Sequence, residues 1–398
     1  MKEHRYDVCV VGGLGHVGLP LGLAFAQAGK RVILYDIDER ARTIVSSGQM
    51  PFMEEGAESV LREVLDVRLW LSADKRVIRD SYFVIVVIGT PVDDHLNPKF
   101  TLFKDFLDDI LDYLHADQHI ILRSTVYPGT TEVIRRYLES RGKGTRVSFC
   151  PERIAQGKAL EELRTLPQIV AAFDQPTAEE AGGLFSHLTK EILYLTPIEA
   201  ELAKLFTNVW RYIQCSIGNQ FYQIALQHGL DFYRIYHAIK YQYPRTQGLL
   251  PPGFTAGPCL FKDTMQLAAF SNNSFFLGHA AMLVNEGLPN LIVRRLKERD
   301  SLKDRTVGIL GMAFKADIDD KRESLSYKLQ RILEIEAGRV LCSDPYIQDA
   351  HFLPAEVLIR EADIVILGAP HRVYAQLLIP AGKHLVDVWN FFGKGGLF

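Results

Sequence analysis

The chain has 398 residues, a length that corresponds to two or three domains rather than one. Lys and Arg number 45 against 48 Asp and Glu, which leaves a net charge of -3, and 47% of the residues are hydrophobic. This balance excludes the basic field of a nucleic-acid-binding protein, and no apolar run reaches the ~20 residues of a membrane span. We therefore expect neither a nucleic acid nor a membrane as partner.

Five cysteines are scattered at positions 9, 150, 215, 259 and 342, an odd number without a CxxC pair. This pattern argues against a disulfide framework and against a structural zinc site. The amino terminus runs directly into an apolar strand and lacks the apolar core of a signal peptide. The sequence therefore predicts a cytoplasmic protein without a metal site.

Short β-branched runs alternate with longer amphipathic stretches at the start of the chain. Several runs are almost continuously apolar, which is typical of parallel strands buried on both faces. Helical periodicity fills most of the intervals, so residues 1–196 are predicted to form a doubly wound α/β domain. The predicted strands are Tyr6–Val11, Arg31–Tyr35, Phe83–Ile88, His119–Arg123, Arg146–Phe149 and Gln168–Ala172.

Residues 197–300 differ in character and are predicted to form a central helical domain. An apolar 3.6-residue repeat from Glu199 to His228 predicts one long helix, and a second helical stretch runs from Cys259 to Leu288. Between them Tyr241–Pro258, dense in Pro, Gly and Tyr, is predicted to be an ordered loop. A long helix in mid-chain commonly separates two lobes and forms a dimer face.

Strand–helix alternation resumes in residues 301–398, which are predicted to form a second, smaller α/β domain. The fold class expected for the whole chain is α/β, with two Rossmann-like doubly wound domains joined by a central helical domain that contains a long helix. The predicted strands of the last domain are Thr306–Leu310, Arg339–Cys342, Asp363–Leu367 and His384–Val388.

A GxGxxG pattern follows the first predicted strand and opens a helix, as in dinucleotide-binding domains. Gly13 permits the tight turn, Gly15 lets the backbone approach a pyrophosphate, and Gly18 lets helix and strand pack closely. Asp36 closes the second strand and can accept hydrogen bonds from a ribose 2′-OH, and the acidic residues that follow would repel a 2′-phosphate. The cofactor is therefore predicted to be NAD, held by Gly13, Leu14, Gly15, His16, Val17, Gly18 and Asp36.

Four further segments place polar or nucleophilic side chains together. The run 120–131 is a strand end followed by a hydroxyl-rich turn, and the run 150–158 places a carboxylate after the next strand, where open α/β sheets bind ligands. Lys204 and Asn208 lie four residues apart on one helix face. Cys259 stands at a loop-to-helix junction with Asp263 one turn on. Each segment alone has an ordinary structural explanation, since most single cysteines are small buried apolar residues.

Together, in this order and at these distances, the motifs resemble the UDP-glucose/GDP-mannose dehydrogenase family. The resemblance runs from residue 6 to about residue 390, nearly the whole chain. The matching pieces are the glycine-rich turn, the Val-Ile-Gly-Thr-Pro-Val run at 87–92, Ser124-Thr-Val-x-Pro-Gly-Thr-Thr131, Cys150-Pro-Glu-Arg153, the Glu-Ala-Glu-x-x-Lys-x-x-x-Asn helix, Gly257-Pro-Cys-x-x-Lys-Asp263 and Gly311-Met-Ala-Phe-Lys-Ala-Asp-Ile-Asp-Asp-Lys-Arg322.

This resemblance implies a four-electron oxidation of the C6 alcohol of a UDP-sugar to a carboxylate, with two NAD used per turnover. Two hydride transfers require a way to hold the intermediate aldehyde, and a thiolate can do so as a thiohemiacetal and then a thioester that water hydrolyses. We assign Cys259 as this nucleophile, because a helix N-terminus favours the thiolate.

The family resemblance also implies the other site residues and a homodimer. Lys204 and Asn208 would stabilise oxyanions, Asp263 would act as base, Thr125 would position water and Glu152 would assist hydrolysis. The substrate-binding residues implied are Glu152, Arg153, Ile154, Lys204, Asn208, Arg245, Phe254, Gly257 and Lys315, with Arg245 at a position where relatives reach across a dimer. Thr90, Thr125 and Arg322 are implied as further cofactor-binding residues.

The motifs point to two different substrates. Relatives specific for UDP-glucose usually have an aromatic-Leu pair and a second Glu where this chain has Arg153, Ile154 and Gln156, and this form resembles the branch that oxidises UDP-N-acetylhexosamines. The Cys-Leu-Phe-Lys-Asp run from Cys259 to Asp263 instead resembles the UDP-glucose and GDP-mannose branch. UDP-glucose and a UDP-N-acetylhexosamine therefore both stay candidates.

Two other functional classes are weighed against this one. A β-hydroxyacid or 6-phosphogluconate type dehydrogenase shares the dinucleotide domain and a helical Lys-x-x-x-Asn pair, but it transfers one hydride with Lys204 as acid/base and needs no thiol. A non-catalytic NAD-binding or nucleotide-binding scaffold would need none of the catalytic positions, and here each is filled by a competent residue.

Overall fold

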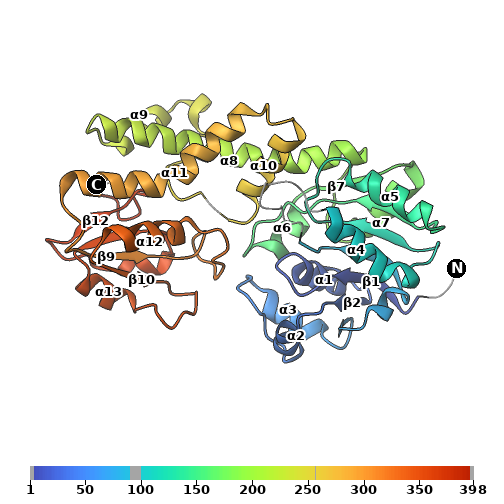
Figure 1. The fold of residues 1–398 in the computed structure, drawn as a ribbon. Coiled ribbons are helices and arrows are strands. Elements are labelled where there is room, and N and C mark those ends of the chain that lie inside the picture. The colour runs from blue at the N-terminus through green and yellow to red at the C-terminus, as the bar shows by residue number, and fades with distance from the viewer. Residues whose placement is uncertain (1–3, 90–99, 256, 395–398) are drawn as a thin grey trace. The chain divides into compact units, whose positions relative to one another are not determined.

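A computed structural model describes residues 4–89, 100–255 and 257–394 of the chain (Figure 1). The chain divides into two compact units, Met1–Thr207 and Asn208–Phe398. Each unit contains a sheet covered by helices. In the sequence the long helix α8 (Pro197–Gln227) follows the last strand of the first sheet and precedes the second sheet, which confirms the predicted fold class. The division falls within α8, and the domain boundaries after residues 196 and 300 stay predictions.

The first unit is built on one sheet whose described strands run in the order β3-β2-β1-β4-β5-β6-β7-β8. These strands are β1 (Tyr6–Val11), β2 (Val32–Tyr35), β3 (Leu69–Ser72), β4 (Ser81–Val86), β5 (His119–Leu122), β6 (Arg146–Phe149), β7 (Gln168–Ala172) and β8 (Ile192–Leu195). β1 pairs in parallel with both β2 and β4. The strand order reverses at β1, and ligands of open α/β sheets bind at such a switch point.

Helices cover both faces of this sheet (Figure 1). They are α1 (Gly18–Gln27), α2 (Glu39–Ser46), α3 (Ala57–Val64), α4 (Phe100–Ile110), α5 (Thr130–Ser140), α6 (Ala159–Thr165) and α7 (Gln175–Phe185), with short 3-10 turns at Lys75–Ile78 and Leu111–Tyr113. Val8 and Val10 of β1 pack with α1, α3, α6 and α7, whereas Cys9 and Val11 pack with α4 and α5. Burial on both faces explains why the strands are almost continuously apolar.

Two strands and one strand direction differ from the sequence-based expectation. β3 and β8 were not predicted; both are short edge strands, and Leu193 and Tyr194 of β8 are exposed. β7 pairs antiparallel to β6, so the expectation of parallel strands was wrong there. Phe149 at the end of β6 pairs with Ala171 of β7, so the chain re-enters the sheet at the edge where β6 ends and β7 runs back along it.

The second unit has a smaller parallel sheet in the order β10-β9-β11-β12 among its described residues. All four strands were predicted: β9 (Thr306–Leu310), β10 (Arg339–Ser343), β11 (Ile364–Leu367) and β12 (His384–Val386). α11 (Phe276–Arg299) and α12 (Leu325–Glu336) cover one face, and α13 (Ala355–Glu361) covers the other. The remaining helices are α9 (Phe232–Lys240), α10 (Leu260–Phe270) and the 3-10 turns Pro244–Thr246 and Arg372–Gln376.

The long helix predicted from Glu199 to His228 is confirmed as α8. The second predicted helical stretch is instead two helices, α10 and α11, because Asn272 and Asn273 adopt positive φ angles of 51° and 58° after α10. Such left-handed residues commonly end a helix. Within the described ranges, no helix is long and apolar enough to cross a membrane.

Candidate active site

The glycine-rich turn after β1 combines close packing with one open position. A Cβ on Gly18 would lie 2.5 Å from the carbonyl oxygen of Gly12, and a Cβ on Gly13 would lie 2.8 Å from the Cβ of Leu34. Gly12 has a φ of +76°, so the left-handed turn falls at Gly12, which the sequence analysis did not single out. At Gly15 the nearest atom to an added Cβ is 3.9 Å away. The open space at Gly15 fits the approach of a pyrophosphate.

Asp36 lies at the end of β2 and touches this turn. Its Oδ2 accepts a hydrogen bond of 2.9 Å from the N–H of Leu14, and its Oδ1 accepts one of 3.0 Å from the N–H of Asp38. The side chain is half-buried, so its oxygens have lone pairs left for a ribose hydroxyl. The geometry of the turn and of Asp36 is compatible with the adenosine diphosphate half of NAD, and the assignment of these residues to the cofactor stays a prediction. Thr90, also predicted to contact the cofactor, lies outside the described residues.

The segment after β6 rests on the glycine-rich turn. The amide Nε2 of Gln156 donates a 3.0 Å hydrogen bond to Nδ1 of His16, and the His16 ring centroid lies 4.0 Å from that of Phe52. The segment predicted to bind substrate is therefore adjacent to the turn predicted to bind NAD. Sequence reasoning gave no role to Phe52 and Glu54, because their partners are distant in the sequence: Phe52 contacts His16, and Glu54 contacts Gly157 and Ala159, 103 and 105 residues away.

Glu152 is held by three groups. Its Oε1 accepts hydrogen bonds from the N–H groups of Arg153 and Ile154, at 2.6 and 2.7 Å. Its Oε2 pairs with Arg123, which is almost completely buried and also donates to the carbonyl oxygen of Cys150. Both carboxylate oxygens therefore have partners within the protein, and these contacts hold the backbone of residues 152–154 in one conformation. Sequence reasoning missed Arg123, which ends the strand before the hydroxyl-rich turn.

Glu201 ties the start of α8 to the hydroxyl-rich turn. Its carboxylate accepts hydrogen bonds from the N–H groups of Gly129 and Thr131 and from the Thr131 hydroxyl. Burial raises the pKa of Glu201, although these hydrogen bonds oppose the shift. The contact sets the helix that bears Lys204 against the turn that contains the half-buried Thr125. Lys204 itself is buried, with 8% of its surface exposed.

In the second unit the structure brings together Asn208, Cys259 and Asp263. Cys259 is exposed and precedes the first residue of α10, and its carbonyl oxygen accepts a 2.9 Å hydrogen bond from the N–H of Asp263. Asp263 is fully buried, and its Oδ2 accepts a 2.6 Å hydrogen bond from the side-chain amide of Asn208. Its Oδ1 lies 3.3 Å from Nζ of Lys262 without the geometry of a hydrogen bond. The Cys259 thiol and the buried Asp263 carboxylate thus belong to residues one turn apart at the start of α10, and the amide of Asn208 reaches the carboxylate from α8.

The loop before Cys259 is ordered in its described residues, as predicted. The side-chain oxygen of Asn219 in α8 accepts a 2.8 Å hydrogen bond from the N–H of Gly253. Gly257 has a φ of +108°, and a Cβ there would lie 2.8 Å from the ring of Phe314. Phe254 is buried in the core of the second unit. Glycine at 257 therefore lets this loop lie directly on the loop after β9.

The loop after β9 contains two of the predicted cationic residues, Lys315 and Arg322. The guanidinium of Arg322 donates to both carboxylate oxygens of Asp320, and this pairing raises the pKa of Arg322. Arg245 lies elsewhere, exposed in the turn after α9, with its guanidinium 5.9 Å from the ring centroid of Tyr243.

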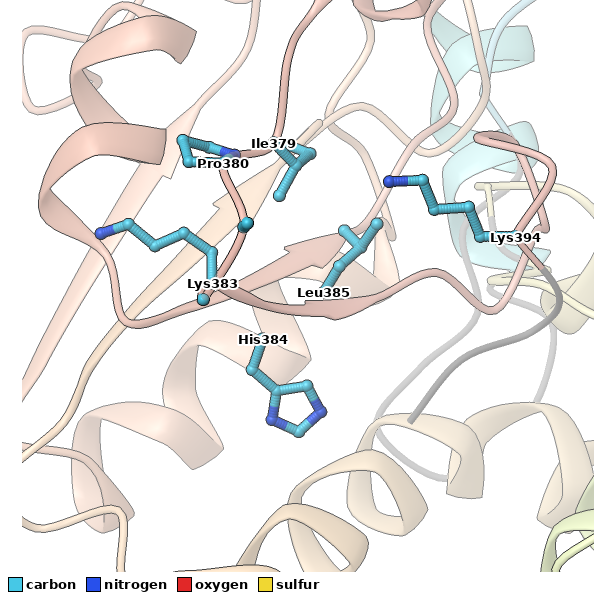
Figure 2. Close-up of a pocket in the computed structure, with 8 residues that line it drawn as sticks. Ile379, Pro380, Lys383, His384, Leu385 and Lys394 are labelled. Atoms are coloured by element: carbon cyan, nitrogen blue, oxygen red, sulfur yellow. The ribbon is translucent and has the colours of Figure 1, made fainter.

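A hollow of about 420 Å³ lies before β12, lined by residues 379–385 and Lys394. The Nζ of Lys383 donates to the carbonyl oxygens of Arg360 and Ala362 at the end of α13. Figure 2 shows that Lys383 and His384 point in different directions rather than toward a common point. The hollow is at the amino end of β12, whereas ligands of such sheets bind at the carboxyl ends. We therefore do not assign it to the active site.

Known families match the chain over nearly its whole length. Three models of the UDP-glucose/GDP-mannose dehydrogenase family match: its NAD binding domain at residues 6–189, its central domain at residues 198–286 and its UDP binding domain at residues 308–394. The chain belongs to the UDP-glucose/GDP-mannose dehydrogenase family. It is an NAD-dependent oxidoreductase of nucleotide sugars, as the motifs implied.

Individual members of the family resemble the chain at 25–28% identity. The UDP-N-acetyl-D-mannosamine dehydrogenase of Pyrococcus horikoshii is 28% identical over 374 residues, which cover 90% of this chain and 88% of the relative. The solved structure of a UDP-glucose dehydrogenase from Pyrobaculum islandicum has a TM-score of 0.88 at 26% identity, covering 100% of this chain and 95% of that one. An NDP-N-acetyl-D-galactosaminuronic acid dehydrogenase from Ralstonia nicotianae is 25% identical and covers 92% and 91% of the two chains.

Two glycine substitutions in this dehydrogenase are expected to separate cofactor binding from folding. Gly15→Ala adds a methyl group where the protein leaves space, so the melting temperature should stay within about 2 °C while NAD binding weakens by about tenfold or more. Gly18→Ala places a methyl group 2.5 Å from the Gly12 carbonyl and should lower the melting temperature. Calorimetric titration with NAD and thermal unfolding measure both effects. Unchanged NAD affinity in Gly15→Ala would contradict the assigned turn.

Proposed function

We propose that the enzyme oxidises the C6 alcohol of a UDP-sugar to the carboxylate in two hydride transfers, with Cys259 holding the intermediate covalently. The observation that supports this proposal is the exposed Cys259 thiol at the start of α10, one turn from the buried Asp263–Asn208 pair. A single-hydride dehydrogenase needs no thiol at this place. A non-catalytic scaffold gains nothing from a buried carboxylate paired with an amide, since such burial is costly.

In the first oxidation the C6 hydroxyl loses a proton and the carbon loses a hydride, which gives an aldehyde. NAD, when bound, accepts the hydride in both oxidations. Asp263 takes the hydroxyl proton directly or through a water that Thr125 positions. Asn208 uses one amide hydrogen on Asp263 and offers the other to the substrate oxygen, and the Lys204 ammonium stabilises the same developing charge.

In the second oxidation the Cys259 thiolate adds to the aldehyde carbon, and a C–S bond forms. The resulting thiohemiacetal alkoxide loses a hydride from carbon to become a thioester. Water then attacks the carbonyl carbon, the C–S bond breaks, and the carboxylate, the thiolate and two protons are released. The oxygens of Glu152 are occupied by Arg123 and backbone N–H groups, so its contribution to hydrolysis is to hold residues 152–154 in place.

We further propose a UDP-N-acetylhexosamine as the substrate. Two observations support it: Arg153, Ile154 and Gln156 resemble the acetamido branch, and several similar curated relatives are named UDP-N-acetyl-D-mannosamine dehydrogenases. UDP-glucose is the second candidate, because the Cys-Leu-Phe-Lys-Asp run and the Pyrobaculum islandicum structure favour it.

A panel of sugar nucleotides tests the substrate. UDP-ManNAc, UDP-GlcNAc, UDP-GalNAc, UDP-glucose and GDP-mannose are offered separately with NAD, and both NADH and the sugar acid are quantified. We expect kcat/KM for one acetamido sugar to exceed that for UDP-glucose by about tenfold or more. A reversed ratio would favour the second candidate, and no acid from any of the five would contradict the proposed function.

We also propose that the enzyme is a homodimer that pairs through α8. The buried side of this helix is polar, because Glu201, Lys204 and Asn208 are buried. The opposite apolar side is exposed, and its residues from the middle of the helix are Trp210, Ile217, Phe221 and Ile224. Buried polar groups fit an active site, and an exposed apolar stripe fits a protein interface. The solvent-exposed Arg245 fits a residue that reaches a neighbouring subunit.

Charge in the stripe should separate the subunits. The double substitution Trp210→Glu, Phe221→Glu places two carboxylates on a surface that is buried in the proposed dimer, so we expect a monomer at concentrations where the unmodified enzyme is a dimer. Light scattering after size-exclusion chromatography measures the mass. Ile335→Glu serves as control, because Ile335 is an exposed apolar residue of α12, away from the stripe. A monomeric unmodified enzyme would contradict the dimer.

A further inference from the structure

A buried carboxylate organises the ends of two strands in the second unit. Asp344 directly follows β10, and its side chain is fully buried. Its Oδ2 accepts hydrogen bonds of 2.7 and 3.0 Å from the N–H groups of Met312 and Ala313, after β9. Its Oδ1 accepts hydrogen bonds of 2.9 and 3.0 Å from the N–H groups of Tyr346 and Ile347. One side chain therefore joins the loops after β9 and β10.

A buried histidine, His371, connects the loop after β11 to Asp344. The side chain of His371 is fully buried, and its Nε2 lies 3.1 Å from Oδ2 of Asp344. Its Nδ1 lies 2.9 Å from the backbone N–H of Asp317, which can only donate. Nδ1 must therefore accept, and the hydrogen on Nε2 points to Asp344. This assignment makes His371 a neutral link between Asp344 and the loop after β9.

The bond to Asp317 acts on a strained residue of that loop. Asp317 has a φ of +57°, a conformation that is unfavourable for a non-glycine residue and persists only where tertiary contacts hold it. Besides His371, the exposed Arg372 holds it, donating from N and Nε to the Asp317 carboxylate. Lys315 lies two residues before Asp317, and Arg322 follows five residues later.

Asp344 occupies the position in its sheet that Asp36 occupies in the other, directly after the second strand of a βαβ unit. Asp36 is half-buried and accepts two backbone hydrogen bonds, so it has capacity for a ribose hydroxyl. Asp344 accepts four backbone hydrogen bonds and contacts His371, and it is closed to solvent. It is therefore built to position protein groups and not to bind a ligand directly.

We infer that Asp344 and His371 are a positioning pair that fixes the loop 312–323 for the nucleotide part of the UDP-sugar. The inference rests on the proposed function, and within this loop Lys315 is the residue that the family resemblance assigns to the substrate, whereas Arg322 is assigned to the cofactor. The same loop supports the catalytic loop, because Phe314 packs on Gly257 and the N–H of Gly257 donates to the Glu323 carbonyl at 3.4 Å. Loss of the pair therefore makes the loop 312–323 less fixed in position, although no residue that contacts the substrate is removed.

Two substitutions of His371 test the pair. In His371→Asn the side-chain oxygen can replace Nδ1 as the acceptor for the Asp317 N–H, but the side chain does not reach Asp344. In His371→Gln the side-chain amide can donate to Asp344, but the Asp317 N–H loses its acceptor. We expect the dissociation constant of UDP and the KM of the UDP-sugar to rise about tenfold in His371→Gln and less in His371→Asn. The value of kcat should change by about threefold at most, and NAD affinity should change less than UDP affinity, because Arg322 is the one residue of this loop that is assigned to the cofactor.

His119→Gln is the matched control. His119 is also fully buried and bonded to a carboxylate, with Nδ1 2.7 Å from Oε2 of Glu180, but it belongs to the first unit. Its substitution should lower the melting temperature without changing UDP affinity. UDP binding is measured by calorimetry and the melting temperature by thermal unfolding, on the full chain. A purely structural role for His371 predicts the same result as for His119.

UDP affinity within twofold of the unmodified enzyme in a folded His371→Gln variant would overturn the inference and leave the proposed function intact. Failure of the unmodified enzyme to bind UDP would overturn both. If His371→Gln does not fold, His371→Asn alone tests the pair, because it keeps the acceptor for the Asp317 N–H and loses the contact with Asp344. This variant should weaken UDP binding about threefold, and unchanged affinity would again overturn the inference.

Discussion

Replacing Cys259 with serine is expected to lower the rate of acid formation about 1000-fold or more, while NAD and UDP affinities stay within about twofold. Serine is nearly isosteric, and Cys259 is exposed, so the fold should not respond. A hydroxyl is a much weaker nucleophile than a thiolate at neutral pH, so neither the thiohemiacetal nor the thioester would form at a useful rate. Chromatographic quantification of the sugar acid measures the loss.

Cys215→Ser is the control for this substitution. Cys215 is a half-buried cysteine of α8 in the same unit, and burial raises the pKa of its thiol, which keeps it protonated and unreactive. This variant should retain more than about half of the activity. A Cys259→Ser enzyme that still forms acid at a tenth of the original rate would contradict the covalent route.

Asp263→Asn is expected to lower kcat by about 100- to 1000-fold, with a smaller effect on KM. The carboxylate is the proposed base: its Oδ2 accepts the hydrogen bond of Asn208, whereas its Oδ1 lies 3.3 Å from Nζ of Lys262 without a hydrogen bond and so keeps its lone pairs for the substrate proton. The amide of an asparagine has the same shape but accepts protons poorly. Steady-state kinetics with NADH detection separates kcat from KM.

An exchange of the two side chains distinguishes a base from a structural partner. In the double variant Asn208→Asp, Asp263→Asn the amide and the carboxylate change places, so the hydrogen bond of 2.6 Å can form again in the opposite direction. We expect the melting temperature to return to within about 2 °C of the original value while kcat stays low. Recovery of kcat would show that only the hydrogen bond matters, which contradicts the assignment of Asp263 as base.

The features that were predicted correctly from the sequence depend on residues that lie close together in the sequence. The strands around β1 are apolar on both faces because helices cover both sides, and this pattern is visible in six residues. Likewise, the position of Cys259 before α10 with Asp263 one turn later follows from a few consecutive residues. The NAD-binding turn was predicted through Gly13, Gly15 and Gly18, although the left-handed φ belongs to Gly12.

The features that the sequence did not predict depend on partners far along the chain. Arg123 holds Glu152 across 29 residues, and His371 reaches Asp344 across 27 and the Asp317 N–H across 54. No periodicity marks such pairs, because each partner sits alone at the end of a strand. The antiparallel direction of β7 was missed as well, because it depends on the edge of the sheet from which the chain returns and not on the composition of the strand itself.

The number of NADH molecules formed per UDP-sugar consumed tests the central claim most directly. The unmodified enzyme is given a limiting amount of the sugar nucleotide that it oxidises best and an excess of NAD, and absorbance at completion is compared with the acid produced. The covalent two-hydride route predicts two NADH and one carboxylate per sugar, without free aldehyde. One NADH per sugar, with the aldehyde or a ketone as product, would contradict the route and would favour single hydride transfer with Lys204 as the acid/base.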